Sequence, residues 1–158
     1  MDAQVAVAPV VRRVGEGDKR WFFGGGVWTW KSSGADSAGG LVVVEVEMDA
    51  GKVTPLHTHP VAESLWVLEG RLRYHIAGDD CELGVGDFAM VPAGIAHAFL
   101  VLGEPARVLA IQPSDACEAF YLGASEPLEG SARVTDFERI GQSAQLNGGI
   151  EILGPPPF

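Results

Sequence analysis

Apolar and polar residues alternate along most of the chain, in short segments that end at turn residues. Between positions 41 and 48 every second residue is a valine or methionine, and two glutamates occupy positions between them. A period of two places one set of side chains in a core and the other toward solvent, as in a half-buried β-strand. Comparable segments recur roughly every 8–12 residues, with glycine, proline or aspartate between them. The pattern predicts an all-β barrel or sandwich.

The expected strands are short and closely spaced. The segment 20–31 predicts two aromatic strands broken at Gly24-Gly25-Gly26, and its tryptophans are expected to pack against a sheet or a subunit face. This glycine triplet favours a turn over a phosphate-cradling loop, because the Gly-Lys-Ser/Thr ending of such loops is missing. Residues 32–40 are rich in serine and glycine and predict a loop. The other strands are expected at 41–48, 63–69, 71–76, 81–85, 88–91, 96–102, 107–112 and, as the last strand of the barrel, 118–122.

Both ends of the chain differ from the barrel, which is expected to span 19–125. Residues 1–18 alternate weakly and predict an outer strand, and the proline within them favours an edge position. Residues 126–158 form a C-terminal extension. Within it, Thr135 begins a capping-box sequence that predicts a short helix over about 136–146, followed by a proline-rich tail.

Length, composition and charge limit the class of protein. The 158 residues are typical of one domain with its own core, and 21 glycines and 10 prolines are too many for a helical bundle. With 11 basic and 21 acidic residues the net charge is −10, which disfavours nucleic acid and anionic lipid as partners. Cys81 and Cys117 are expected to be free thiols in a reducing compartment, and no apolar run is long enough to span a bilayer. We therefore expect a soluble cytoplasmic protein without membrane or nucleic-acid partners.

Three histidines and one glutamate stand where they can converge on one point. His57 and His59 are two residues apart, so their imidazoles share a face on an extended strand. Glu63 follows four residues later, and His97 lies in a separate segment with glycine and proline turns. Three nitrogens and one carboxylate oxygen suit Fe, Ni, Mn, Co, Cu or Zn, whereas Ca²⁺ and Mg²⁺ prefer oxygen ligands. We therefore predict one divalent transition metal bound by all four residues.

Other reactive side chains lack a comparable pattern. His75 alternates with Tyr74 and other apolar residues of its segment, so it is expected to face solvent. No Gly-x-Ser-x-Gly sequence is present, and neither Cys81 nor Cys117 has a histidine close by in sequence. The sequence therefore offers little support for nucleophilic catalysis.

The spacing of the predicted ligands resembles the two motifs of the cupin superfamily over residues 40–112. The aromatic N-terminal segment and the C-terminal helix are also similar to those of bacterial single-domain cupins related to quercetin 2,3-dioxygenases. One position departs from the family, because Val101 stands where the second motif has asparagine. The motifs read Gly51-x5-His57-x-His59-x3-Glu63-x6-Gly70 and Gly86-x5-Pro92-x-Gly94-x2-His97.

The resemblance implies a fold and an activity. It implies a single cupin barrel, a double-stranded β-helix or jelly roll, with homodimerisation expected, and a metal-dependent dioxygenase acting on a small aromatic or enolisable substrate. Glu63 would be both a metal ligand and the base that accepts a substrate hydroxyl proton before O₂ attacks the ring. Tyr74, Phe99 and Val101 are the candidate substrate contacts, because the strand of His97 is expected to present an apolar wall. Two alternatives stay open: a redox-neutral cyclase, isomerase or lyase, and a non-enzymatic barrel that binds a small molecule.

Overall fold

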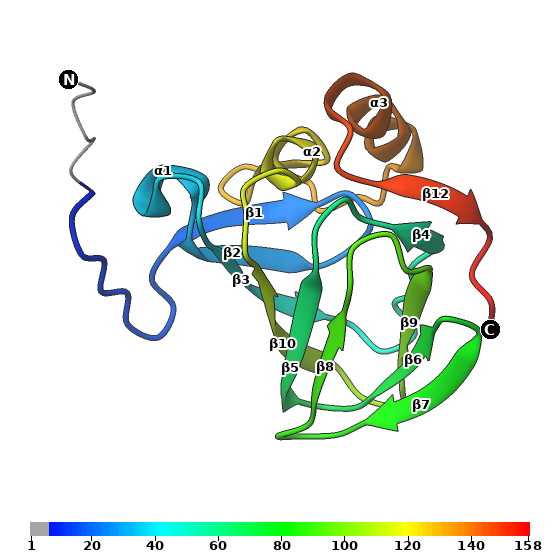
Figure 1. The fold of residues 1–158 in the computed structure, drawn as a ribbon. Coiled ribbons are helices and arrows are strands. Elements are labelled where there is room, and N and C mark those ends of the chain that lie inside the picture. The colour runs from blue at the N-terminus through cyan, green and yellow to red at the C-terminus, as the bar shows by residue number, and fades with distance from the viewer. Residues whose placement is uncertain (1–6) are drawn as a thin grey trace.

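A computed structural model describes residues 7–158, whose strands form two antiparallel β-sheets around one core (Figure 1). The larger sheet has the strand order β11-β1-β2-β3-β10-β5-β8, and the smaller one has the order β12-β4-β9-β6-β7. This arrangement is the all-β jelly-roll barrel that the alternation predicts. The strands are β1 (Asp18–Phe22), β2 (Val27–Ser32), β3 (Val42–Met48), β4 (Leu56–Thr58), β5 (Glu63–Glu69), β6 (Leu72–Ile76), β7 (Asp79–Leu83), β8 (Phe88–Val91), β9 (His97–Val101), β10 (Ala106–Gln112), β11 (Ser125–Pro127) and β12 (Glu151–Gly154).

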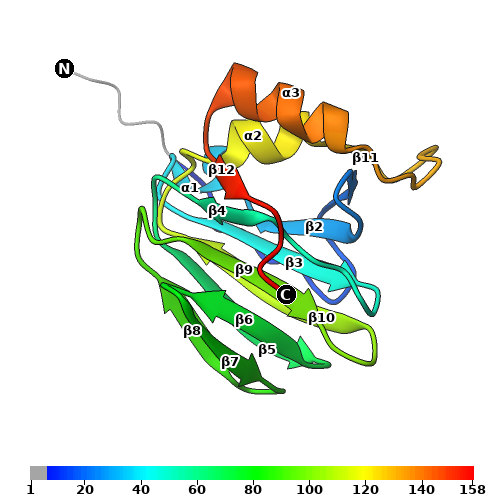
Figure 2. The same cartoon turned by 90° about the vertical axis from the view of Figure 1, so that its right-hand side faces the viewer.

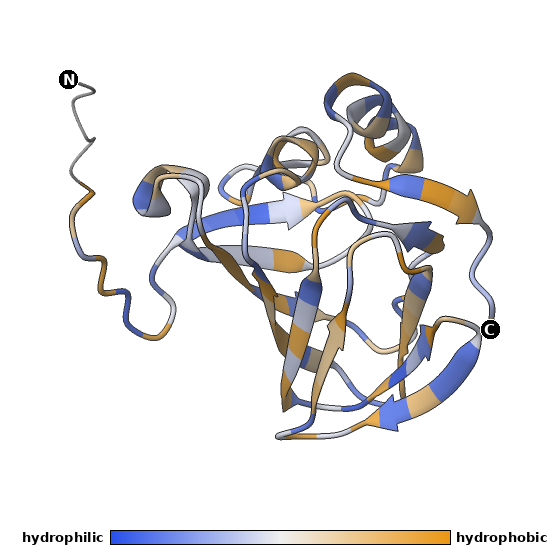
Figure 3. Ribbon diagram, viewed as in Figure 1, coloured by the Kyte–Doolittle hydropathy of each residue, from blue (hydrophilic) through white to orange (hydrophobic). Residues whose placement is uncertain are grey.

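The core lies between the sheets and follows the period of two. On β3 the side chains of Val42, Val44, Val46 and Met48 are buried, while Glu47 is exposed. Figure 3 shows the same change between apolar and polar residues along the barrel strands. Each buried valine or methionine of this kind stabilises the fold by about 1.5–3 kcal/mol relative to an exposed one. The strand predicted at 41–48 is confirmed.

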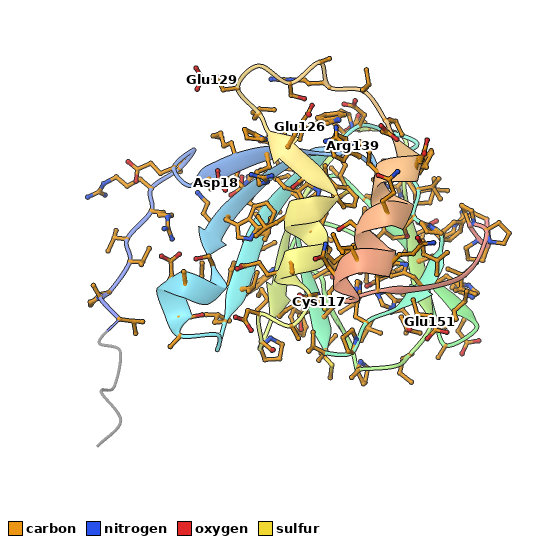
Figure 4. All side chains as sticks on the ribbon, turned by 90° about the horizontal axis from the view of Figure 1, so that it is seen from above. Asp18, Cys117, Glu126, Glu129, Arg139 and Glu151 are labelled. Carbon is orange, nitrogen blue, oxygen red and sulfur yellow. The ribbon has the colours of Figure 1, made fainter. Side chains whose placement is uncertain are left out.

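Three helices accompany the sheets: α1 (Gly34–Ser37), α2 (Glu118–Gly123) and α3 (Phe137–Asn147). Helices α2 and α3 lie side by side over one end of the barrel (Figure 2), where the Ser143 hydroxyl of α3 donates to the Phe120 carbonyl oxygen of α2 at 2.7 Å. From above, Arg139 of α3 reaches Glu126 of β11 at 3.5 Å (Figure 4). The predicted C-terminal helix is confirmed. Among residues 7–158, no helix is both long and apolar enough to cross a membrane.

The strand predicted at 118–122 is wrong, because this segment forms helix α2. Its buried side chains are Cys117, Phe120, Tyr121 and Ala124, which follow the i, i+3, i+4, i+7 spacing of a helix with one apolar face. The preceding strand, β10, already ends at Gln112, where the chain leaves the sheet. The short apolar segment therefore has the period of 3.6 residues of a helix and not the period of two of a strand.

The predicted N-terminal strand, helix cap and loop also differ from the structure. The outer strand predicted at 1–18 does not form over residues 7–17, which have no regular structure before β1 begins at Asp18, and residues 1–6 lie outside the described part. The N-cap of α3 is Asp136 and not the predicted Thr135. The Asp136 carboxylate accepts a hydrogen bond from the Arg139 backbone amide. The loop predicted at 32–40 contains the short helix α1.

Candidate metal centre

Three imidazoles converge between the two sheets. His57 on β4 pairs directly with His97 on β9, and His59 follows at the end of β4. One ring nitrogen from each histidine lies within 4.8 Å of the others, and all three side chains are buried. The spacing of His57 and His59 therefore works as the sequence predicts, and strand pairing brings in the third imidazole.

Each imidazole is held by a backbone carbonyl group. The Nδ1 atoms of His57 and His97 lie 2.7 Å and 2.8 Å from the carbonyl oxygens of Pro55 and Ile95, each two residues earlier in the chain. His59 Nδ1 lies 2.7 Å from the carbonyl oxygen of Gly149, far along the chain. A carbonyl oxygen can only accept, so each Nδ1 carries a proton and a neutral ring keeps its lone pair on Nε2, which in His59 lies 3.4 Å from the Tyr121 hydroxyl. This is the arrangement that orients metal-ligating histidines.

The residues present fit a bound metal ion. His97 Nε2 is buried, and no group among the described residues donates a hydrogen bond to its lone pair. Burial lowers the pKa of His57 to about 4 and also lowers that of His97, so both rings are neutral at pH 7. Neutral imidazoles with free Nε2 lone pairs are the ligand form that a divalent transition metal requires.

Glu63, at the start of β5, lies beside this group of imidazoles. Its Oε2 is 3.3 Å from His59 Nε2, and its Oε1 is 3.9 Å from His97 Nε2. The converging group consists of the three histidines without Glu63, so the role of Glu63 as fourth ligand stays a prediction. Burial raises the pKa of Glu63, but the neighbouring imidazoles and a hydroxyl hydrogen bond lower it more, and the net direction is down. Glu63 is thus an ionised carboxylate at neutral pH.

Tyr121 and Gln112 hold this carboxylate in place, and neither residue is predicted from the sequence. The Tyr121 hydroxyl and the Gln112 side-chain amide donate to Glu63 Oε2 at 3.2 Å and 3.1 Å, and Gln112 also donates to the Tyr121 hydroxyl at 3.1 Å. Burial, followed by the charge of Glu63, raises the pKa of Tyr121 well above its usual value, so the phenol remains a donor. The strand predicted at 118–122 does not direct Tyr121 toward Glu63, whereas the helical spacing of this segment is a sequence signal that does.

A cavity of about 380 Å³ opens from the metal centre, and its lining is almost entirely apolar. Phe99, one of the candidate substrate contacts, is among the lining residues. Tyr74 and Val101 do not belong to the lining: both are buried in the core, and the Tyr74 ring contacts the rings of His97 and Phe99 at centroid distances of 6.1 Å and 6.2 Å. The lining residues come from β3 and β10 (Val42, Val44, Val46, Met48, Val108, Ala110), from the first hairpin (Phe22, Trp28) and from the C-terminal segment (Phe137, Ile140, Ile150, Ile152, Pro156).

The remaining reactive side chains lie apart or are inactive. His75 is not among the converging histidines and pairs with Asp80 at 2.6 Å on the sheet surface. Cys81 is exposed. Cys117 lies 4.0 Å from His59 Nδ1, but burial raises the pKa of its thiol to about 12. A thiol with that pKa is not a nucleophile at neutral pH.

Residues 44–112 match the family model described as Cupin domain. Over this segment the chain is similar to a cupin domain. The matched segment runs from β3 to β10 and includes all four predicted ligands, together with the strand pairing that brings them to one site. The fold of this segment thus agrees with the resemblance seen in the sequence, and the set of four ligands stays a prediction.

Individual relatives support the same fold. Quercetin 2,3-dioxygenase from Bacillus subtilis (strain 168) is 31% identical over 102 residues, which cover 64% of this chain and 30% of the relative. The chain thus spans about a third of that relative's length. The polyketide cyclase RemF from Streptomyces resistomycificus is 25% identical, with a TM-score of 0.51 over 72% of this chain and 80% of RemF. KdgF from a Halomonas species is 20% identical, with a TM-score of 0.59 over 67% of this chain and 94% of KdgF, and shows the fold alone.

Gly149 couples the C-terminal segment to the metal centre. Its carbonyl oxygen accepts from His59, its φ is +82°, and an added Cβ would lie 3.0 Å from both the Cys117 Cα and the Phe120 Cβ. We expect Gly149→Val to displace this carbonyl and to weaken Co²⁺ binding roughly 10–100-fold, as loss of an outer hydrogen bond to a ligand does. A Co²⁺ titration followed by visible absorption measures this.

The control for this variant is Gly154→Ala on the same C-terminal segment. Gly154 has open space around it and no positive φ, so the substitution is tolerated there. Circular dichroism establishes that both variants are folded. A folded Gly149→Val protein with unchanged Co²⁺ affinity would show that His59 does not need this carbonyl.

Proposed function

We propose that this protein is a metal-dependent oxygenase that acts on a small aromatic or enolisable substrate, in the manner of a quercetinase. The observation that supports the proposal best is the position of the three imidazoles and Glu63 beside an apolar cavity of about 380 Å³. A buried metal centre that serves only structure has no need of such a space. The similarity to quercetin 2,3-dioxygenase supports dioxygenase chemistry.

His57, His59 and His97 would hold the metal, with Glu63 as the predicted fourth ligand. The chemistry that a redox-active metal supplies when bound is Lewis acidity toward a substrate hydroxyl and electron exchange with O₂. In a dioxygenase both oxygen atoms of O₂ enter the product, so no external reductant is needed. The protein's own contribution is to orient the substrate and to accept its proton.

Glu63 is the group that accepts this proton. Its Oε2 is occupied by the hydrogen bonds from Tyr121 and Gln112, so Oε1, which points toward His97, is the free position. A lowered pKa makes Glu63 a weak base, and the transfer therefore needs a substrate hydroxyl that is itself made acidic at the metal centre. Tyr121 and Gln112 prevent the carboxylate from rotating away from the cavity.

The cavity walls favour a flat, apolar substrate. Valines from β3 and β10 form one side, and the rings of Phe22, Trp28 and Phe99 supply aromatic surface. Such walls exclude water from a reactive intermediate and orient a planar ring.

A redox-neutral reaction is the second candidate. RemF, a polyketide cyclase, covers most of this chain at 25% identity, and the same ligands could hold a metal that acts only as a Lewis acid. In that case Glu63 would still accept a proton, but O₂ would not be consumed.

Oxygen uptake separates these candidates. Protein reconstituted in turn with Fe²⁺, Ni²⁺, Mn²⁺, Co²⁺, Cu²⁺ and Zn²⁺ would be screened in an oxygen electrode with flavonols and phenolic polyketides. We expect uptake to require both metal and substrate, with metal-free protein as the control. Product formation without oxygen would favour the redox-neutral reaction, and saturable binding without product would favour a binding module.

A further inference from the structure

Lys52 is the only lysine or arginine among the residues that line the cavity. It directly follows Gly51 and is half-buried. Among the described residues its Nζ has no carboxylate partner, and its one hydrogen bond goes to the Val53 carbonyl oxygen at 3.3 Å. A cation is therefore held in an apolar cavity without a counter-ion, which costs free energy unless a ligand supplies the negative charge.

The glycine triplet of the first hairpin makes room for this ammonium group. A Cβ added to Gly24 would lie 3.0 Å from Lys52 Nζ, and one added to Gly25 would lie 3.7 Å from its Cδ. The triplet thus leaves space for a lysine from the segment between β3 and β4. Burial lowers the pKa of Lys52 to about 8, so the group is still mostly charged at pH 7.

A row of aromatic rings connects Lys52 with the metal centre. Lys52 Nζ lies 5.8 Å from the centroid of the Phe22 ring, and Phe22 stacks on Trp28 at 4.5 Å with an interplanar angle of 25°. The Trp28 ring lies 4.9 Å from that of Tyr121, whose hydroxyl donates to Glu63. All of these residues line the cavity. One wall thus has a cation at one end, aromatic surface in the middle and the metal centre at the other end.

We propose that the cavity binds planar aromatic molecules that carry an anionic group, with the anion paired to Lys52 and the rings packed along Phe22 and Trp28. The claim that such a molecule is the substrate rests on the proposed function, whereas the binding preference does not. The distance is suitable for a small molecule, because Lys52 and His57 are five residues apart and their Cα atoms can be separated by at most ~17 Å. With a net charge of −10 on the whole chain, the anionic ligand depends on this local cation.

Two dyes that differ only in charge test this proposal. 8-Anilinonaphthalene-1-sulfonate carries a sulfonate, and N-phenyl-1-naphthylamine is the same ring system without it. Fluorescence titrations on the full chain would compare Lys52→Met, which keeps an apolar side chain of similar length, with Lys52→Arg, which keeps the charge. The matched control is Lys19→Met, because Lys19 is exposed on β1 and its loss changes the net charge by the same amount.

We expect Lys52→Met to weaken binding of the sulfonate dye roughly tenfold, the effect of losing one charge-assisted contact. Binding of the neutral dye should change by less than about twofold, because the apolar surface is kept. Lys52→Arg and Lys19→Met should bind both dyes as the unmodified protein does. An equal loss for both dyes would show that Lys52 only packs its aliphatic chain against the cavity, and no loss for either would also overturn the proposal. The measurement involves no turnover, so it stands even if the proposed reaction fails.

Discussion

Replacing His97 with alanine should reduce Co²⁺ affinity by at least about a thousandfold, which exceeds the 10–100-fold cost of losing an outer partner of a ligand. The Nε2 atom of His97 is buried and has no hydrogen-bond partner within residues 7–158, and the strand pairing of His97 with His57 sets the position of both rings. Two imidazoles and Glu63 would remain, so the site would lose one of its three neutral nitrogen ligands. Co²⁺ titration by visible absorption and metal analysis of the purified protein both measure the loss.

His75→Ala is the matched control for this variant. His75 is the one histidine outside the converging group, and its imidazole is engaged by Asp80 on the sheet surface. The His75→Ala protein should bind Co²⁺ with the affinity of the unmodified protein. Because His97 is fully buried, thermal unfolding of both variants is needed to separate loss of the ligand from loss of the fold. A folded His97→Ala protein that binds Co²⁺ with unchanged affinity would place the metal elsewhere.

The convergence of the three histidines could be predicted from the sequence, because short-range patterns mark the strands and turns that carry them. His57 and His59 share a strand face by their spacing alone, and glycine and proline turns mark the hairpins that bring His97 to them. The alternating valines of β3 likewise report a sheet with one buried face. In each case a short-range rule, the period of two, determines which side chains point inward.

The groups that support the ligands could not be predicted in the same way. Gly149 reaches His59 across 90 positions of the sequence, and Gln112 reaches Glu63 across 49. Such contacts depend on how the C-terminal segment and β10 pack against the barrel, and no local pattern encodes them. Tyr121 is different, because its helical spacing is present in the sequence, whereas the strand predicted there assumes a period of two. The position of Lys52 in the cavity could not be predicted either, because a single lysine after a turn normally faces solvent.

Glu63→Gln tests whether Glu63 acts as a base as well as a ligand. Glutamine has nearly the same shape and can still accept the hydrogen bonds from Tyr121 and Gln112, but it cannot take up a proton at the free oxygen that points toward His97. We expect the rate of substrate-dependent O₂ uptake per bound metal to fall roughly a hundredfold or more, the usual contribution of a positioned general base. Metal affinity should fall much less than in His97→Ala, because all three imidazoles and their carbonyl partners remain.

The charge lost in Glu63→Gln needs its own control. Glu47→Gln on β3 changes the net charge by the same amount at an exposed position of the same sheet, and it should leave uptake unchanged. Normalising the rate to bound metal is essential, because a variant that merely loses metal would also lose activity. Uptake per metal equal to that of the unmodified protein would remove Glu63 from proton transfer and leave it only as a ligand. The lowered pKa of this carboxylate would then reflect its place beside the imidazoles, and the substrate would have to lose its proton to solvent.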